Sequence, residues 1–260
     1  MSKSVAFRSA ASKSVVIDCF AESAARYRKR YAVVVIDVVR ATTTAITAVA
    51  LGRRCLPVTS LDAAHSLAGR LADPLLVGEV DGVMPNEFDI NNSPAALAKR
   101  TDLHRPAILL SSSGTKLLQS AASCEVVFLA CLRNFTSLAS HLASSSGDVA
   151  IIGAGTRGEF REEDQMCCAW IADRLFDFGY RAGNEATAAI AERWRGCSPD
   201  AWTHGNSAAY LRRSRQLDDL EFILRHIDDL DAVFTLRDGE VMCEPIVRAE
   251  PAYERELAYD

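Results

Sequence analysis

The sequence predicts an α/β protein in which helices cover both faces of a mostly parallel or mixed central sheet, giving three layers. Two patterns in the 260 residues support this prediction. Short runs of aliphatic, often β-branched residues recur along the chain, and each indicates a strand buried on both faces. Helical spacing follows most of these runs, and this alternation is typical of parallel sheets. The runs are residues 33–36, 75–78, 106–110, 126–130 and 149–152.

The other elements follow in chain order. We expect a loose tail at residues 1–11, a short apolar run and a polar helix up to residue 30, and together these form an N-terminal extension. The main domain is expected at residues 31–247, divisible into two α/β lobes at 31–145 and 146–247, with a C-terminal tail at 248–260. The Asp238-Gly239 pair between two apolar runs predicts a closing β-hairpin. The helices are expected at residues 45–51, 61–71, 94 onward, 114 onward, 136–143, 162–178 and 186–194, with mostly helical spacing from there to residue 230.

Composition excludes several classes of function. The net charge is −5 and the pI is about 5.6, so the chain lacks the excess of positive charge that binds nucleic acid or an anionic membrane. No run is long enough to span a bilayer. The eight cysteines are scattered without a C-x-x-C pair, which indicates reduced thiols in a cytoplasmic protein. A small molecule is the expected partner, and a homo-oligomer is compatible with the sequence.

The run at residues 33–44 is the first place to look for chemistry. The strand stops at Asp37 and Arg40, and three hydroxyls, Thr42, Thr43 and Thr44, precede helical spacing. Ligands of open α/β sheets bind where parallel strands end and helices begin, and the helix start offers free N–H groups to an anion. The alternative is structural: Asp37 or Thr42 caps the helix, and Arg40 pairs with a surface acid.

A second strand ends in Glu79. The loop that follows it shows neither the helical nor the strand spacing of apolar residues. Asp89 lies in this loop next to an aromatic anchor, Phe88. Carboxylates from Asp37, Glu79, Asp89 and Asp164 form a set of hard oxygen ligands suited to Mg²⁺. For the loop acids the alternative is a solvated surface.

The strand at residues 106–110 leads into a serine-rich helix start. The hydroxyls and amides of Ser112, Ser113, Gly114 and Thr115 are suited to cradle a phosphate. The lysine and spacing of a P-loop are missing, so the signal by itself is weak.

Residues 153–158 spell G-x-G-x-x-G after a strand. A nicotinamide-dependent oxidoreductase would need a second strand ending in an acid about 20 residues on. Helical spacing and glycines occupy that region, so we discount this alternative. Glycines such as Gly155 and Gly158 can still bring amides close to an anion.

Several motifs together resemble one family, the magnesium-dependent 2-phosphosulfolactate phosphatases of coenzyme M biosynthesis, the ComB family. The similar segments are residues 35–44, 76–79, 88–94, 111–115 and 154–160, with Asn134, Glu163, Asp164 and Cys167, and more weakly residues 207–211. The resemblance implies a ComB-like fold and a cytoplasmic Mg²⁺-dependent phosphatase that converts 2-phospho-3-sulfolactate and water into 3-sulfolactate and phosphate. It implies catalytic roles for Asp37, Arg40, Glu79 and Asp164, metal binding by Asp37, Glu79 and Asp89, and phosphate binding by Thr42, Thr43, Thr44, Ser112, Ser113, Gly114, Thr115, Asn134, Gly155 and Gly158.

Two positions depart from the family pattern. Val80 stands where the pattern has an arginine, and Ser113 stands where it has an asparagine. We therefore expect weaker selectivity for phosphosulfolactate unless Arg157 or Arg133 supplies the missing charge. A non-catalytic ligand-binding relative is the remaining alternative. The residues leave open whether Asp37 is the nucleophile or a metal ligand that helps to activate water.

Overall fold

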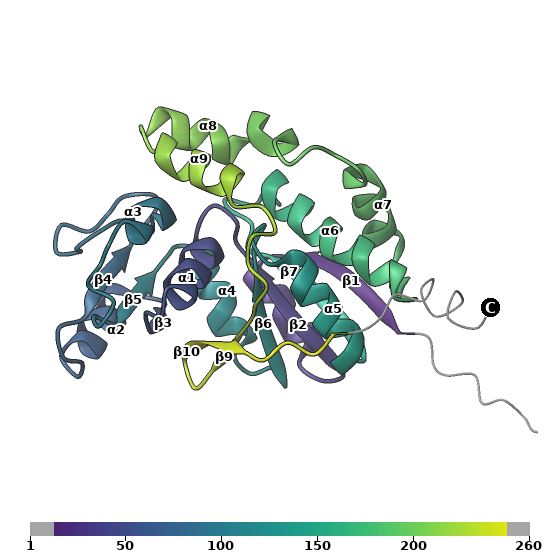
Figure 1. Ribbon diagram of the computed structural model, residues 1–260, viewed down its shortest axis with the longest axis horizontal. Coiled ribbons are helices and arrows are strands. Elements are labelled where there is room, and N and C mark those ends of the chain that lie inside the picture. Colours follow the sequence, from purple (N-terminus) through teal and green to yellow (C-terminus); the bar gives the residue numbers. More distant parts are fainter. Residues whose placement is uncertain (1–12, 249–260) are drawn as a thin grey trace, which may run out of the picture.

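The computed structural model describes residues 13–248, and its core is a ten-stranded mixed sheet (Figure 1). The strand order is β4-β5-β3-β10-β9-β6-β2-β7-β1-β8. The strands are β1 (Ser14–Cys19), β2 (Tyr31–Ile36), β3 (Cys55–Val58), β4 (Leu75–Gly78), β5 (Ala107–Leu110), β6 (Val126–Ala130), β7 (Asp148–Gly153), β8 (Arg181–Ala182), β9 (Val233–Arg237) and β10 (Glu240–Glu244). The predicted α/β class with a mixed sheet is confirmed. The expected tails fall largely on residues 1–12 and 249–260, outside the described residues.

The sheet contains two parallel sets of strands joined by a hairpin. Strands β6, β2, β7, β1 and β8 form one set, and β4, β5 and β3 form the other. The predicted closing hairpin, β9–β10, pairs antiparallel with β6 on one side and with β3 on the other. These three antiparallel pairings make the two parallel sets run in opposite directions through the sheet.

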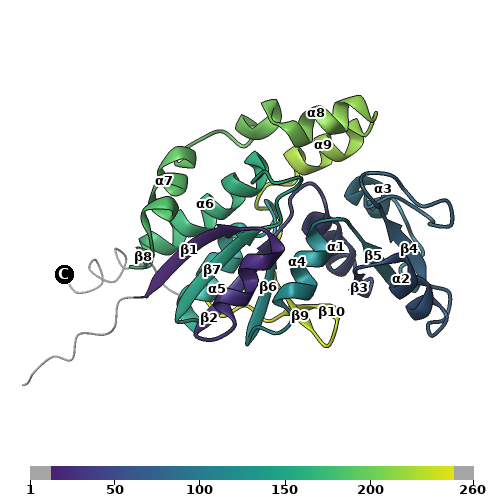
Figure 2. The ribbon, with the colours of Figure 1, turned by 180° about the vertical axis from the view of Figure 1, so that it is seen from behind.

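Alternating residues of β2 show why the protein has three layers. Val34 and Ile36 pack in the hydrophobic cluster that includes residues of α5 (Phe135–Ser145) and α6 (Glu162–Asp177), on the near face in Figure 1. Val33 and Val35 pack in the cluster that includes residues of α4 (Gly114–Ala121), on the opposite face seen in Figure 2. Because successive side chains of a strand point to opposite faces, a strand covered on both sides must be apolar throughout. The other helices are η1 (Ala21–Tyr27), α1 (Ala41–Ala50), α2 (Leu61–Ala68), α3 (Pro94–Ala98), α7 (Glu185–Trp194), η2 (Ala201–His204), α8 (Asn206–Arg213) and α9 (Leu217–Arg225).

Residues expected in an N-terminal extension contribute to the sheet itself. Strand β1 lies between β7 and β8, and its register pairs Val15 with Val149 and Ala182. The side chains of Val15, Val16 and Ile17 are buried there.

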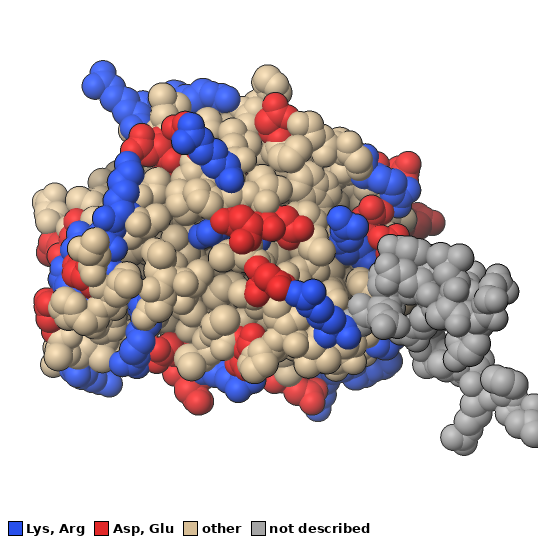
Figure 3. Space-filling view, viewed as in Figure 1, with Lys and Arg blue, Asp and Glu red and all other residues tan. Residues whose placement is uncertain are grey.

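Charges of both signs are intermixed on the face of the molecule drawn in Figure 3. Figure 3 shows Lys and Arg side chains among Asp and Glu side chains on the face drawn, without an extended patch of one sign. No helix within residues 13–248 combines the length and the apolar character needed to cross a membrane.

Candidate active site

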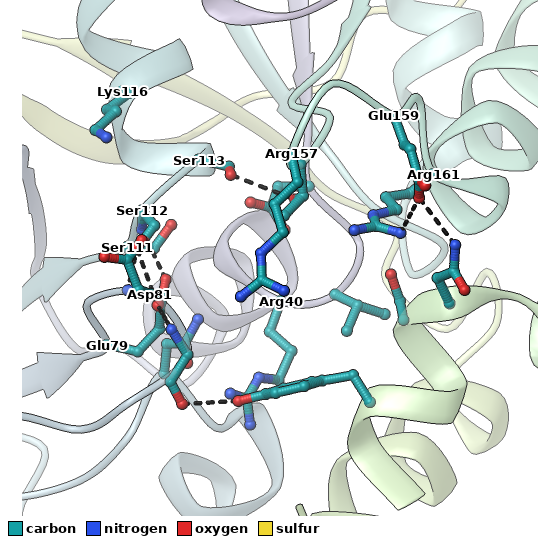
Figure 4. Close-up of a pocket in the computed structure, with 18 of the residues that line it drawn as sticks. Arg40, Glu79, Asp81, Ser111, Ser112, Ser113, Lys116, Arg157, Glu159 and Arg161 are labelled. Atoms are coloured by element: carbon teal, nitrogen blue, oxygen red, sulfur yellow. Dashed lines mark hydrogen bonds and ion pairs between the residues drawn. The ribbon is translucent and has the colours of Figure 1, made fainter. Parts of the chain in front are cut away.

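Loops from both parallel sets line one pocket of about 530 Å³. They follow β2, β4, β5 and β7, and helix α8 closes the side (Figure 4). Both signs of charge line this pocket. The acidic residues are Asp37, Glu79, Asp81 and Glu159, and the basic residues are Arg40, Lys116, Arg157, Arg161 and Arg213.

Asp37 follows β2 and lies between two helix starts. Its carboxylate accepts the Ala41 N–H at 3.1 Å at the start of α1, and it lies against Gly114 at the start of α4. A Cβ at Gly114 would lie 2.3 Å from Asp37 Oδ2, so only glycine permits this approach. Burial, followed by the nearby charge of Glu79, raises the pKa of Asp37 from 3.8 to about 6, although the amides oppose the shift.

Glu79 follows β4 and is also buried. One carboxylate oxygen accepts the Ser112 N–H at 2.7 Å, and the other accepts the Ser112 hydroxyl at 3.0 Å and the Gly82 N–H at 2.5 Å. These donors come from the loops after β4 and β5, so Glu79 joins the two loops on the pocket side. Its charge is close enough to Asp37 to contribute to the raised pKa there.

Asp164 and Glu163 lie behind Asp37 in the first turn of α6. Asp164 accepts the Val38 N–H at 2.8 Å, which ties the start of α6 to the loop after β2. Burial raises the pKa of Asp164 well above its ordinary value, and the neighbouring Glu163 and Asp37 raise it further. Burial likewise raises the pKa of Glu163 to about 7. Neither residue lines the pocket itself, and the hydrogen bond from Val38 is what connects Asp164 to the loop that carries Asp37.

Arg40 is held almost completely out of solvent. Its guanidinium pairs with Asp219 of α9 at 2.5 Å and also donates to Gln216 and, at 3.3 Å, to Asn91. The side chains of Arg40 and Asp219 are 3% and 2% exposed. A buried guanidinium needs such a carboxylate, because an isolated buried charge is very costly. Arg40 therefore lines the pocket in a fixed position.

The carboxylates fit a Mg²⁺ ion only in part. No cluster of three or more His, Cys, Asp and Glu side chains arranged for a metal ion occurs within residues 13–248. Protein Mg²⁺ sites often use only one or two carboxylates and leave the other positions to water and phosphate oxygens. Asp37 and Glu79 provide such a pair. Asp89 does not line the pocket, because it pairs with Arg105 at 3.3 Å and accepts the Leu76 N–H.

A sequence model of the family described as 2-phosphosulpholactate phosphatase matches residues 18–239. The chain belongs to this family. A relative from Caldanaerobacter subterraneus subsp. tengcongensis, named probable 2-phosphosulfolactate phosphatase, is 29% identical over 215 residues, which are 80% of this chain and 89% of the relative. Relatives of the same name from Deinococcus radiodurans and Carboxydothermus hydrogenoformans are 33% identical over 192 residues and 37% over 145. These segments cover 71% and 55% of this chain, and 80% and 60% of the relatives. The family predicted from the motifs is confirmed.

The other residues predicted for phosphate binding fall into two groups. Ser112 and Ser113 line the pocket. The second group is buried or turned to its own backbone: Thr42 bonds to Asp37, Thr43 to Val38, Thr44 to Asn92, Thr115 to Ser111, and Asn134 to Cys131 and Leu129. The threonines lie at the starts of α1 and α4 and Asn134 precedes α5, and none of these side chains lines the pocket.

Internal packing and a turn account for the glycines of the G-x-G-x-x-G run. A Cβ at Gly153 would meet Phe160 at 2.3 Å, and one at Gly155 would meet Phe20 at 2.6 Å. Gly158 lies in a tight turn with φ +76°. Our expectation that no strand follows α6 is wrong, because β8 pairs with β1 there. It has only two residues, however, and Gly183 and Asn184 follow it in place of an acid.

Pattern analysis missed several pocket residues. Lys116 of α4, Asn206 and Arg213 of α8, and Arg161 ahead of α6 all line the pocket. In the sequence, the weak family match at residues 207–211 was the only indication that α8 lies next to the pocket. The two positions that depart from the family pattern lie in different surroundings. Ser113 lines the pocket, whereas the side chain of Val80 is exposed and does not line it. Arg133 pairs with Asp229 outside the pocket, so Arg157 is the one of the two suggested cations that reaches it.

Proposed function

We propose that this protein is a Mg²⁺-dependent phosphatase that hydrolyses 2-phosphosulfolactate to 3-sulfolactate and phosphate. The observation that carries the proposal is the pair of buried carboxylates, Asp37 and Glu79, beside the amide-rich start of α4. Family membership and the names of the relatives support the substrate. Eight unpaired cysteines fit the reducing cytoplasm, where we place the protein.

The two carboxylates would hold the metal ion on the floor of the pocket. When bound, Mg²⁺ supplies positive charge that neutralises the oxygens of the transferring phosphoryl group. The chain itself supplies oriented donors. Ser112 and Ser113, just ahead of α4, line the pocket with their hydroxyl groups, and fixed dipoles of this kind stabilise charge without reorganising.

Asp37 is suited to either of two roles. An ionised Asp37 can attack phosphorus and form an aspartyl phosphate, which water then hydrolyses. Alternatively it keeps its charge on the metal ion while water attacks directly. In both cases the P–O ester bond breaks, and the sulfolactate oxygen leaves and takes up a proton. Trapping a phosphorylated Asp37 in a rapid acid quench would select the first route.

Phosphate release tests the proposal. The purified protein is incubated with 2-phosphosulfolactate, 2-phospholactate and glycerol 2-phosphate, with Mg²⁺ or with EDTA. We expect release that EDTA abolishes and added Mg²⁺ restores, with 2-phosphosulfolactate hydrolysed fastest. Absence of release from all three esters would reject a phosphatase function, and release unaffected by EDTA would reject the metal dependence.

A further inference from the structure

Three tight turns in the described part of the chain share one backbone form. Each has positive φ at both central residues, which are Asp81-Gly82, Arg157-Gly158 and Asp238-Gly239. Such turns favour Asn or Asp before Gly, because a short polar side chain tolerates the left-handed conformation. Two of the three turns follow this rule. The third places arginine, with φ +54°, in a conformation that is costly for a long side chain.

The arginine turn is fixed at both ends across the pocket. Thr156 and Glu159 exchange backbone hydrogen bonds of 2.9 and 3.0 Å that close the turn. The Thr156 hydroxyl lies 3.3 Å from that of Ser113 at the start of α4. At the other end, Glu159 accepts from Asn206 of α8 at 2.8 Å and pairs with Arg161. The turn therefore holds its central residue over the pocket.

Arg157 carries a charge that no carboxylate of residues 13–248 pairs with. Of the other three pocket arginines, Arg40 and Arg161 are paired, whereas Arg213 at the end of α8 has no carboxylate partner among these residues. Arg40 pairs with Asp219, and Arg161 pairs with Glu159. Figure 4 shows the Arg157 guanidinium in the middle of the pocket, facing Arg40, while Lys116 points away from the other labelled side chains. An unpaired guanidinium in this position favours an anion in the pocket.

We propose that Arg157 binds an acid group of the substrate that is not transferred, a carboxylate or a sulfonate. This inference rests on the proposed function, because that function puts the phosphoryl group on the floor with Asp37 and Glu79. The other acid groups then extend toward the exposed side of the pocket, where Arg157 lies. A guanidinium binds either group through two parallel N–H donors. This contact supplies the charge that Val80 does not provide.

Arg157→Asn separates binding from folding. Asparagine suits the turn better than arginine, so we expect an equal or higher melting temperature for the variant. We expect its Kd for 3-sulfolactate, measured by calorimetry with Mg²⁺ present, to rise at least about 30-fold, as when a charged contact is lost. The Kd for inorganic phosphate should change less than about threefold. Titrations with lactate and with isethionate, which lack the sulfonate and the carboxylate respectively, show which acid group Arg157 binds.

Two further variants complete the test. Asp238→Arg places arginine in the same kind of turn, in the distant β9–β10 hairpin, and should lower the melting temperature without changing the Kd for sulfolactate. Arg157→Lys keeps the charge without the paired donors and should recover part of the affinity. An unchanged Kd for sulfolactate in Arg157→Asn overturns the inference, and so does an equal loss of affinity for inorganic phosphate. A wild-type protein that releases no phosphate from 2-phosphosulfolactate rejects the proposed function, whereas the sulfolactate titration still decides the role of Arg157.

Discussion

The floor and the rim of the pocket are built in different ways. Asp37 and Glu79 on the floor are buried and accept backbone N–H groups from neighbouring loops and helix starts. Arg157 and Arg213 on the rim are exposed and come from a turn and from the last turn of α8. Groups held by backbone donors have little freedom to move, whereas exposed side chains on loops can change without disturbing the core. We infer that the chemistry and the substrate preference of this site can vary separately.

The largest expected effect concerns the floor. Asp37→Asn keeps the shape of the side chain but removes its charge and its nucleophilicity. We expect kcat for phosphate release to fall about 10⁴-fold or more, as when a nucleophile or an essential charge is lost. Circular dichroism should show an intact fold, because the change creates no cavity.

Asp89→Asn is the matched control, since Asp89 is an acid of the loop after β4 but pairs with Arg105 outside the pocket. Its kcat should stay within about threefold of wild type. A large loss of kcat in Asp89→Asn would mean that Asp89 belongs to the metal site. Near-normal kcat in Asp37→Asn would mean that Asp37 acts only as a helix cap.

The next effect concerns the support beneath the floor. Asp219→Ala leaves the buried guanidinium of Arg40 without its carboxylate, and also removes the acceptor for Ser93 and the Ala95 N–H. Removing one partner of a buried pair typically costs about 3–5 kcal/mol of unfolding free energy. Urea denaturation measures this loss.

The adjacent Asp218→Ala breaks only an exposed pair with Lys99, so its melting temperature should match that of wild type. Equal melting temperatures for the Asp219 and Asp218 variants would mean that the Arg40 pair does not support the site.

The sequence was sufficient to predict the strands of the five aliphatic runs and the residues that follow them directly, whereas the two-residue strand β8 was missed. The runs that end at Asp37 and Glu79 are apolar because both faces of the sheet are covered, and that pattern is local. The opposite direction of the two parallel sets depends on pairing between β10 and β3, which are far apart in sequence, so no local pattern could predict it. The sequence could not predict that Asp89 turns away from the pocket toward Arg105, because its loop has no regular spacing of apolar residues. Asp219 lies on a helix whose spacing does not distinguish a surface acid from a buried partner.

The pH dependence of the unfolding free energy tests whether Asp37 on the floor is as deeply buried as its raised pKa implies. Folding raises the pKa of Asp37 from 3.8 to about 6, mainly through burial. The native state therefore holds this proton more tightly, and the resulting stabilisation is complete below about pH 4 and lost as the pH rises through about 6. A shift of roughly two units corresponds to about 3 kcal/mol at most. In metal-free buffer, Asp37→Asn should match wild type in unfolding free energy at pH 4 and exceed it by up to that amount at pH 8. A constant difference across this range would mean that burial does not raise the pKa.

The smallest expected effect tests how closely the start of α4 approaches the floor. A Cβ at Gly114 would lie 2.3 Å from Asp37 Oδ2 and 2.5 Å from the Cβ of Ala41, so Gly114→Ala must push the carboxylate or the helix away. Overpacking of this kind costs about 1–3 kcal/mol. We also expect kcat to fall at least about tenfold, because the displaced carboxylate loses its fixed position.

Gly147→Ala is the control, since a Cβ there meets nothing within 4 Å. It should leave both the unfolding free energy and kcat near wild type. If Gly114→Ala loses stability but keeps full kcat, the floor tolerates movement, and the separation between a rigid floor and an adaptable rim does not hold.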